Sequence, residues 1–277
     1  MRFAICNEIF EGWSHPDICR FIAQVGYTGL EIAPFTLAPR ITDVTAEKRR
    51  QLRHQAAEHG IEIIGLHWLL ARTEGYHLTS PEVSVRQRTA EYLKELTHAC
   101  ADLGGKVLVF GSPLQRNLAP GMSVAEGINY AANTFQQILP TLADCDVCLC
   151  LEPLGPVETN FLNTCDEALN LIKVMDHPNF RLHLDVKAMS SEATPVPDLV
   201  RTHAQRARHF HANDPNKRGP GFGETDFRPI FQALHAQGYP HWVSVEVFDF
   251  TPDPQTIARE SLRYMRECIG SPSHPHQ

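Results

Sequence analysis

Four side chains of the kinds that bind metal ions end four successive apolar stretches in the second half of the chain: Glu152, Asp185, His211 and Glu246. The stretch before Glu152, residues 147–151, has the length and bulk of a buried parallel strand. A buried carboxylate without a partner is costly, and three carboxylates packed together raise one another's pKa values. A divalent cation resolves both problems and explains the imidazole as a fourth ligand.

Three carboxylates and one imidazole, without a thiolate, suit Mn²⁺, Mg²⁺ or Co²⁺ better than a structural zinc. The carboxylates bring three negative charges against the two positive charges of the ion, which leaves coordination positions for a bidentate ligand or for water. We therefore predict one divalent metal ion, with Mn²⁺ preferred.

Strand and helix signals that position these residues alternate along the whole chain. The expected strands are residues 3–6, 29–33, 61–68, 107–110, 147–151, 180–185, 207–212 and 242–247. The expected helices are residues 15–25, 45–59, 80–104, 123–143, 164–175, 196–202, 225–237 and 254–269. Thr164 and Glu167 have the spacing of a capping box.

Eight strand–helix units without a linker predict a single (β/α)8 TIM barrel over residues 1–270, followed by a tail, 271–277, that we expect to be disordered. A doubly wound open sheet is the alternative, but no GxGxxG follows the first strand. In a barrel the carboxyl ends of the strands surround one mouth, so the four side chains should converge there.

Composition limits the partners of the protein. A net charge of −7 and a pI near 6.1 argue against nucleic acid or an anionic membrane as the main partner. The opening residues are too short for a signal peptide, and no apolar run reaches the length of a membrane span, so we expect a cytoplasmic protein. The eight cysteines have no disulfide or zinc-ribbon spacing and are expected to be reduced core residues.

The motifs around the four side chains resemble those of the xylose isomerase-like TIM barrels, most of all the D-tagatose/D-psicose 3-epimerases and their sugar phosphate isomerase/epimerase relatives. The resemblance rests on Leu151-Glu152-Pro153-Leu154, His183-Leu184-Asp185, residues 209–214 (HFHAND), residues 244–247 (SVEV) and the loop 158–164 (ETNFLNT). Residues 29–32 and 65–68 are also similar, so the resemblance covers the whole chain.

The resemblance implies that Glu152 and Glu246 both bind the metal and move protons, whereas Asp185 and His211 only bind it. A ketose that chelates the ion through its carbonyl and a neighbouring hydroxyl reacts through an enediolate. One glutamate removes a proton next to the carbonyl, and the other returns one to the opposite face. Such an isomerase or epimerase needs a small-molecule sugar and no nucleotide cofactor.

The resemblance also implies substrate contacts. Glu158 matches a residue that hydrogen-bonds the terminal hydroxyl end of the sugar. Lys217 stands where the family has an arginine, and Arg218 is adjacent; because lysine cannot reproduce a bidentate arginine contact, either residue can take this role. His67 and Trp68, which end the third strand, are expected to form a wall of the sugar pocket.

One position departs from the family. The 3-epimerases carry a histidine three residues after the aspartate of the sixth strand, where this chain has Ala188. Lys187 is adjacent and suits an anionic or more oxidised substrate, so the identity of the sugar stays open. His183 and His209 lie two residues before Asp185 and His211, and we expect them one layer deeper in the barrel, as core residues or as support for the ligands.

Three other functions remain on the same scaffold. A metal-dependent lyase of the inosose dehydratase type begins with the same proton abstraction. An apurinic endonuclease-like barrel needs more histidine and acidic ligands and a basic DNA-binding face. A non-catalytic sugar-binding barrel has no need of paired glutamates. Long exposed helices on a barrel commonly support homo-oligomers, and the sequence leaves the number of subunits open.

Overall fold

The computed structural model describes residues 1–270, and the expected tail, 271–277, lies outside the described residues. Eight parallel strands form a closed barrel in chain order, with the last strand paired to the first. They are β1 (Arg2–Cys6), β2 (Gly29–Ile32), β3 (Glu62–Leu66), β4 (Val107–Phe110), β5 (Cys148–Leu151), β6 (Phe180–Asp185), β7 (Ala207–Ala212) and β8 (Trp242–Val245). The predicted (β/α)8 barrel is thus confirmed.

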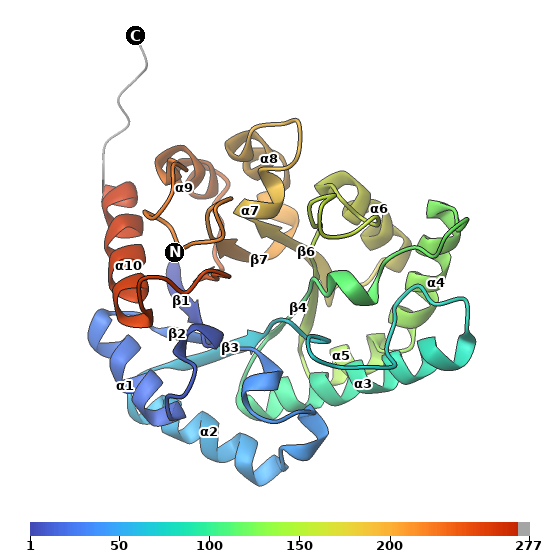
Figure 1. Ribbon diagram of the computed structural model, residues 1–277, viewed down its shortest axis with the longest axis horizontal. Coiled ribbons are helices and arrows are strands. Elements are labelled where there is room, and N and C mark those ends of the chain that lie inside the picture. The colour runs from blue at the N-terminus through green and yellow to red at the C-terminus, as the bar shows by residue number, and fades with distance from the viewer. Residues whose placement is uncertain (271–277) are drawn as a thin grey trace.

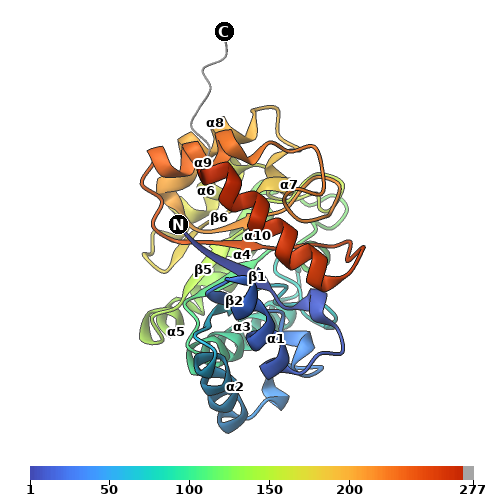
Figure 2. The ribbon, with the colours of Figure 1, turned by 90° about the vertical axis from the view of Figure 1, so that its left-hand side faces the viewer.

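Helices surround the strands as a ring (Figure 1). They are α1 (His15–Val25), α2 (Ala46–Glu58), α3 (Val83–Leu103), α4 (Val124–Gln136), α5 (Leu139–Asp144), α6 (Cys165–Met175), α7 (Val186–Met189), α8 (Val196–His203), α9 (Phe227–Ala236) and α10 (Pro254–Gly270). The short 3-10 turns are η1 (Glu8–Phe10), η2 (Pro34–Thr36), η3 (Ile41–Asp43), η4 (Pro113–Gln115) and η5 (Ala204–Arg206). The last helix, α10, lies beside α1 on the outside of the barrel, which closes the ring (Figure 2).

Hydroxyl side chains begin several of the helices. The Thr45 hydroxyl accepts a hydrogen bond from the Lys48 backbone N–H at the start of α2. Ser123 and Glu126 form a complete capping box at the start of α4. At α6 the predicted box is only half formed, because the Glu167 carboxylate accepts from the backbone N–H of Asn163 at 2.6 Å.

One predicted helix is two helices. The sequence pattern predicts a single helix over residues 123–143, whereas α4 ends at Gln136 and α5 begins at Leu139. Pro140 explains the break, because proline has no backbone N–H and its ring collides with the carbonyl four residues earlier, that of Gln136.

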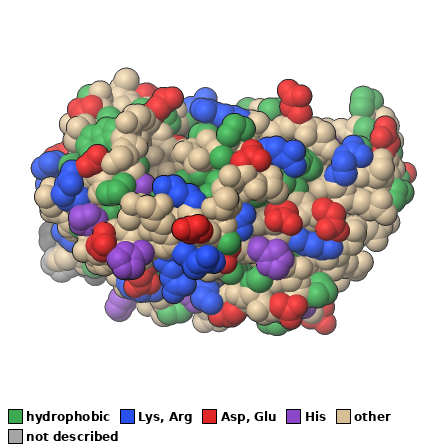
Figure 3. Space-filling view, turned by 90° about the horizontal axis from the view of Figure 1, so that it is seen from below, with side chains coloured by type: hydrophobic (Ala, Val, Ile, Leu, Met, Phe, Trp, Pro, Cys, Tyr) green, Lys and Arg blue, Asp and Glu red, His purple; other side chains and the backbone are tan. Residues whose placement is uncertain are grey.

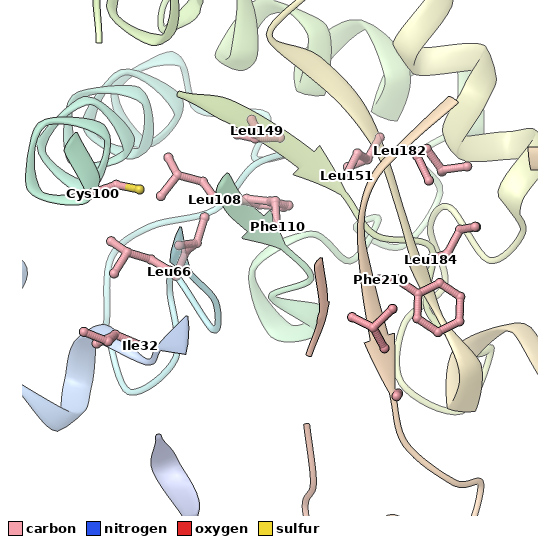
Figure 4. Close-up of a cluster of buried hydrophobic side chains, with 14 of the residues drawn as sticks. Ile32, Leu66, Cys100, Leu108, Phe110, Leu149, Leu151, Leu182, Leu184 and Phe210 are labelled. Atoms are coloured by element: carbon pink, nitrogen blue, oxygen red, sulfur yellow. The ribbon is translucent and has the colours of Figure 1, made fainter. Parts of the chain in front are cut away.

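Alternate residues of each strand face different cores. One large cluster fills the space between the strands and the helices, and Figure 4 shows part of it, with Leu108 and Leu149 of adjacent strands on the same side as Cys100 of α3. The inside of the barrel holds two small apolar groups, Ala4/Ile64/Trp242 and Val107/Val109/Cys148/Cys150. The other inward side chains are polar and lead up to the carboxyl-terminal mouth, where TIM barrels carry their active sites.

The face seen in Figure 3 carries interspersed acidic and basic side chains, with apolar ones scattered among them. Within residues 1–270, no helix combines the length and apolar character that a membrane span requires. All eight cysteines are free, as predicted, and all but Cys145 are buried.

Candidate active site

The four predicted ligands meet at the mouth of the barrel. Asp185 pairs in register with His211, which pairs with Ser244 two residues before Glu246, so adjacent strands bring the side chains to one level. All four residues are buried, with exposed fractions from 0% to 8%. His211 Nδ1 lies 3.2 Å from Glu246 Oε2 and 3.9 Å from Asp185 Oδ2. The barrel therefore brings these four side chains together, as their positions at the ends of the strands predict.

The tightest group contains one further histidine. One ligand atom each from Glu152, His183, Asp185 and His211 lies within 4.8 Å of the others. His183 was expected one layer deeper, yet its Nε2 lies 4.0 Å from Glu152 Oε1, and neither ring nitrogen has a hydrogen-bond partner among the described residues. The spacing of two residues between His183 and Asp185 predicts that both side chains point into the barrel. It does not predict how close the His183 imidazole comes to the other side chains of the cluster.

The charges of this cluster conflict. Burial raises the pKa of Glu152 well above its usual range, and the charges of Asp185 and Glu246 raise it further. Burial also raises the pKa of Asp185 to about 6, with Glu246 adding to the effect. Burial opposes ionisation of Glu246 too, but the charge of His211 and hydrogen bonds from His211 and His67 outweigh it, so its pKa lies well below the usual value.

These residues fit a divalent cation. The donor set is rich in carboxylate oxygen, contains imidazole nitrogen and lacks thiolate, which is the chemistry that Mn²⁺, Mg²⁺ or Co²⁺ accepts. The unpartnered ring nitrogens of His183 and the raised pKa values of Glu152 and Asp185 show that the protein alone leaves this cluster unsatisfied. A cation would compensate the crowded carboxylates.

A carboxylate outside the predicted ligand set, that of Glu31, orients His211. Glu31 of β2 is fully buried, and both of its oxygens lie 3.2 Å from His211 Nε2. Its Oε2 is also 2.8 Å from His209 Nε2. A carboxylate behind a ligating histidine selects the tautomer and holds the ring, so Glu31 leaves His211 Nδ1 turned toward the mouth. His209 is therefore a supporting residue, as expected from its spacing.

Two aromatic side chains hold one carboxylate oxygen of Glu246. Trp68 Nε1–H donates to Glu246 Oε1 at 2.8 Å, and His67 Nδ1 lies 3.2 Å from the same oxygen. The other ring nitrogen of His67, Nε2, lies 3.0 Å from Glu8 Oε2. His67 is fully buried, so it supports the carboxylate instead of forming the predicted wall, and Trp68 alone lines the cavity.

Asn213 connects two of the predicted ligands, a role that its place in the HFHAND motif did not reveal. Its Nδ2 donates to Asp185 Oδ2 at 2.6 Å and to Glu246 Oε2 at 3.4 Å, and its Oδ1 accepts from the Lys187 backbone N–H at 2.8 Å. The side chain is fully buried. Asn213 thus fixes the relative positions of two predicted ligands.

Arg116 is a second residue that the sequence did not single out. Its side chain is fully buried and donates to the carbonyl oxygens of Glu152 at 2.6 Å, Leu162 at 3.0 Å and Gly111 at 3.2 Å. These bonds join the ends of β4 and β5 to the loop that carries Glu158. Burial lowers the pKa of Arg116 to about 10, despite the opposing charges of Glu152 and Glu158.

Gly111 leaves room for the Glu152 carboxylate, because a Cβ added at Gly111 would overlap Glu152 Oε2. We expect Gly111→Ala to displace this carboxylate and lower turnover by about 100-fold, as misplacements near 1 Å do in active sites. The melting temperature should change little, since only a side-chain end must move. Gly270→Ala, which meets nothing within 4 Å, is the matched control; equal activity of both variants would contradict a fixed position of Glu152.

A cavity of about 330 Å³ opens above the cluster, and Glu152 and Glu246 both line it. We call it the catalytic cavity. Glu158 lines it as well, and its Oε2 accepts a hydrogen bond from Lys187 Nζ at 2.8 Å. Glu158 is therefore paired rather than a free loop acid, and the cation of Lys187 is already compensated.

The loop after β7 does not reach this cavity. Lys217 is exposed, and Arg218 donates from Nη2 to the Thr251 carbonyl at 2.7 Å. Neither residue lines the catalytic cavity, so their contact with a substrate stays a prediction. The similarity to the family's arginine-containing loop predicts where this loop lies in the sequence, but it does not predict where its side chains point.

Comparisons with known proteins cover most of the chain. Residues 19–268 match the family described as xylose isomerase-like TIM barrel. A D-psicose 3-epimerase of Ruminiclostridium cellulolyticum is 26% identical over 231 residues, which cover 82% of this chain and 76% of that protein. A solved D-psicose 3-epimerase, crystallised in the presence of D-fructose, has a TM-score of 0.85 at 20% identity, covering 98% of this chain and all (100%) of that one. A 3-keto-D-glucoside 4-epimerase from E. coli has a TM-score of 0.83 at 20% identity, covering 97% of this chain and 100% of that chain.

Proposed function

The chain belongs to the xylose isomerase-like TIM barrel family, and on that premise we propose that it is a metal-dependent enzyme that epimerises or isomerises a ketose. The observation that carries the proposal is the pair Glu152 and Glu246, two buried carboxylates that line one cavity from different strands. The D-psicose 3-epimerase relative supports a ketose as the substrate class.

Glu152, Asp185, His211 and Glu246 are proposed to hold the ion, with His183 within reach of the same position. A bound divalent ion supplies Lewis-acid stabilisation of negative charge on the sugar oxygens. Mn²⁺ is our preferred ion, with Mg²⁺ and Co²⁺ as alternatives, because the donor set is dominated by oxygen.

The two glutamates exchange protons with the substrate. One carboxylate accepts the proton from the carbon next to the ketose carbonyl, which leaves an enediolate, and the other donates a proton to the opposite face. Trp68 Nε1–H and His67 contact Oε1 of Glu246 and hold this carboxylate in place. Its other oxygen, Oε2, lies on the side of the cluster, 3.2 Å from His211 Nδ1. Glu152 is held through its backbone by Arg116. Fixed general acids and bases of this kind contribute about 10²- to 10⁴-fold each.

The Glu158–Lys187 pair is proposed to bind hydroxyl groups of the sugar. Because Lys187 Nζ is 2.8 Å from Glu158 Oε2, the pair offers a donor and an acceptor side by side and no unpaired positive charge. This arrangement disfavours the anionic substrate that Lys187 alone suggested. It also places a polar group near Ala188, where the 3-epimerases have histidine.

A cytoplasmic location forms part of the proposal, supported by eight cysteines that are all free. A metal-dependent lyase of the inosose dehydratase type starts with the same proton abstraction, and no observation in this structure favours it over the epimerase.

Removal of the metal tests the proposal. We expect protein stripped with a chelator to lose conversion of D-fructose, D-tagatose and D-psicose, and Mn²⁺ to restore it, because the ion provides the charge stabilisation that the protein lacks. Chromatography of the products is the measurement, with an inosose in the same panel. Conversion that survives complete stripping would contradict metal dependence, and loss of water from the inosose alone would replace the epimerase with a lyase.

A further inference from the structure

A second cavity lies next to the catalytic cavity and is not used by the proposed reaction. It has a volume of about 290 Å³, and it is lined mainly by the loop that contains η1, the start of α1 and the turn η2. Trp68 and Arg72 line both cavities, so these two side chains form a shared wall, the junction between the cavities. Pockets for small molecules begin at about 300 Å³; each cavity therefore has the size for one small group.

A buried carboxylate whose oxygens lack hydrogen-bond partners among the described residues lines this second cavity. Glu8 is 5% exposed and lines the cavity. Its Oε2 lies in ion-pair contact with His67 Nε2 at 3.0 Å, but neither Oε1 nor Oε2 has a hydrogen-bond partner within residues 1–270. A buried acceptor of this kind is costly unless something donates to it. Glu8 therefore points to a ligand that carries hydrogen-bond donors.

Aromatic rings form much of the remaining wall. Trp13, Phe35, Trp68 and Phe250 all line the second cavity. The Phe35 and Trp68 rings lie 5.7 Å apart at the junction, and the Arg72 guanidinium lies 4.2 Å from the Phe35 ring. Flat rings beside a carboxylate suit a sugar ring, whose C–H faces pack on aromatic surfaces while its hydroxyl groups donate to oxygen.

The charges favour a neutral ligand over an amine or a phosphate. His67 already lies in ion-pair contact with Glu8, and Arg72 supplies a cation at the junction, so a ligand need not bring positive charge. Glu8 and Glu11, which both line the second cavity, disfavour an anion. A hydroxyl-bearing neutral ring meets both conditions.

We propose that the second cavity is a glycosyl-binding subsite, and that the preferred substrate is a ketose that carries a second sugar ring, with the ketose unit in the catalytic cavity and the glycosyl unit against Trp13, Phe35 and Glu8. This inference rests on the proposed function for the chemistry at the ketose. The subsite itself is a binding site and can be tested by binding alone.

The probes are D-fructose and two glucosyl-fructoses that retain a free ketose carbonyl, isomaltulose (linked at O6) and trehalulose (linked at O1). Calorimetric titration of the Mn²⁺-loaded protein measures binding of each, and it requires no turnover. We expect at least one disaccharide to bind tenfold more tightly than D-fructose.

Glu11→Trp is the test variant, because Glu11 is exposed and lines the second cavity, so an indole there should fill it without disturbing the core. Glu47→Trp on the exposed face of α2 is the matched control. The disaccharide preference should disappear in Glu11→Trp and persist in Glu47→Trp, while D-fructose binds equally to all three proteins.

Absence of a preference in the wild-type protein, including no binding of any probe, would overturn the subsite, and so would a preference that survives Glu11→Trp. Failure of the proposed function is distinguishable. A disaccharide preference without conversion of any sugar would support the subsite and contradict the proposed epimerase function. Conversion of D-fructose without a disaccharide preference would support the epimerase function and contradict the subsite.

Discussion

Glu246→Gln should lower kcat by at least about 10³-fold and leave the protein folded. Glutamine has the shape of glutamate but cannot accept a proton, so the variant loses one of the two proton-transfer groups. Its carbonyl oxygen can still accept from Trp68 Nε1, which bonds Glu246 Oε1 at 2.8 Å in the wild type. The measurement is ketose conversion at saturating substrate, with thermal unfolding as the check on folding.

The matched control for this variant is Glu47→Gln, the same change at an exposed position of α2. It should retain full activity. A Glu246→Gln enzyme with turnover near that of Glu47→Gln would remove Glu246 from the catalytic pair, whatever its effect on metal binding.

Asp185→Ala should weaken Mn²⁺ binding by about 100-fold or more, because even residues behind the ligands cost 10- to 100-fold. The Asp185 carboxylate also caps α7, since its Oδ1 accepts from the Ala188 N–H at 2.7 Å. Asp185→Asn is therefore the partner variant: it retains an oxygen for the cap but loses the charge and the second acceptor, to which Asn213 Nδ2 donates. Calorimetric titration with Mn²⁺ measures both, and unchanged affinity in both would exclude Asp185 as a ligand.

Metal binding should weaken in acid. Burial raises the pKa of Asp185 to about 6 in the metal-free protein, with the charge of Glu246 adding to the effect. A protonated carboxylate must release its proton before it ligates. Below pH 6 the apparent affinity for Mn²⁺ should therefore fall roughly tenfold per pH unit for this group, whereas above pH 6 Asp185 should add little pH dependence. Affinity independent of pH from 5 to 7 would contradict this.

The barrel could be predicted because each level of the sequence indicates the same fold. Apolar stretches that end in Glu152, Asp185, His211 and Glu246 recur at the spacing of strand–helix units, and the parallel register then brings the four together. The one large error in the helices is the missed break before Pro140. The apolar pattern over residues 123–143 indicates one continuous helix, whereas proline interrupts a helix at this position.

The supporting residues could not be predicted, because their roles arise from contacts between distant segments. Arg116 has the appearance of an exposed loop residue, yet three backbone carbonyls surround it. Glu8 reaches His67 from a different repeat. For Lys217 and Arg218 the sequence motif predicts the loop but not the direction of the side chains. In the structure Arg218 donates to the Thr251 carbonyl oxygen.

Proton NMR in D₂O tests the central claim most directly. The Mn²⁺-loaded protein is incubated with D-fructose, D-tagatose and D-psicose, and the proton on the carbon next to the carbonyl is followed alongside the appearance of new sugars. The proposal predicts deuterium at that carbon in the product epimer. In Glu246→Gln, both the deuterium exchange and the formation of the epimer should be lost. Formation of an epimer without deuterium, or no exchange in any ketose by protein that binds the metal, would contradict proton transfer by this pair of glutamates.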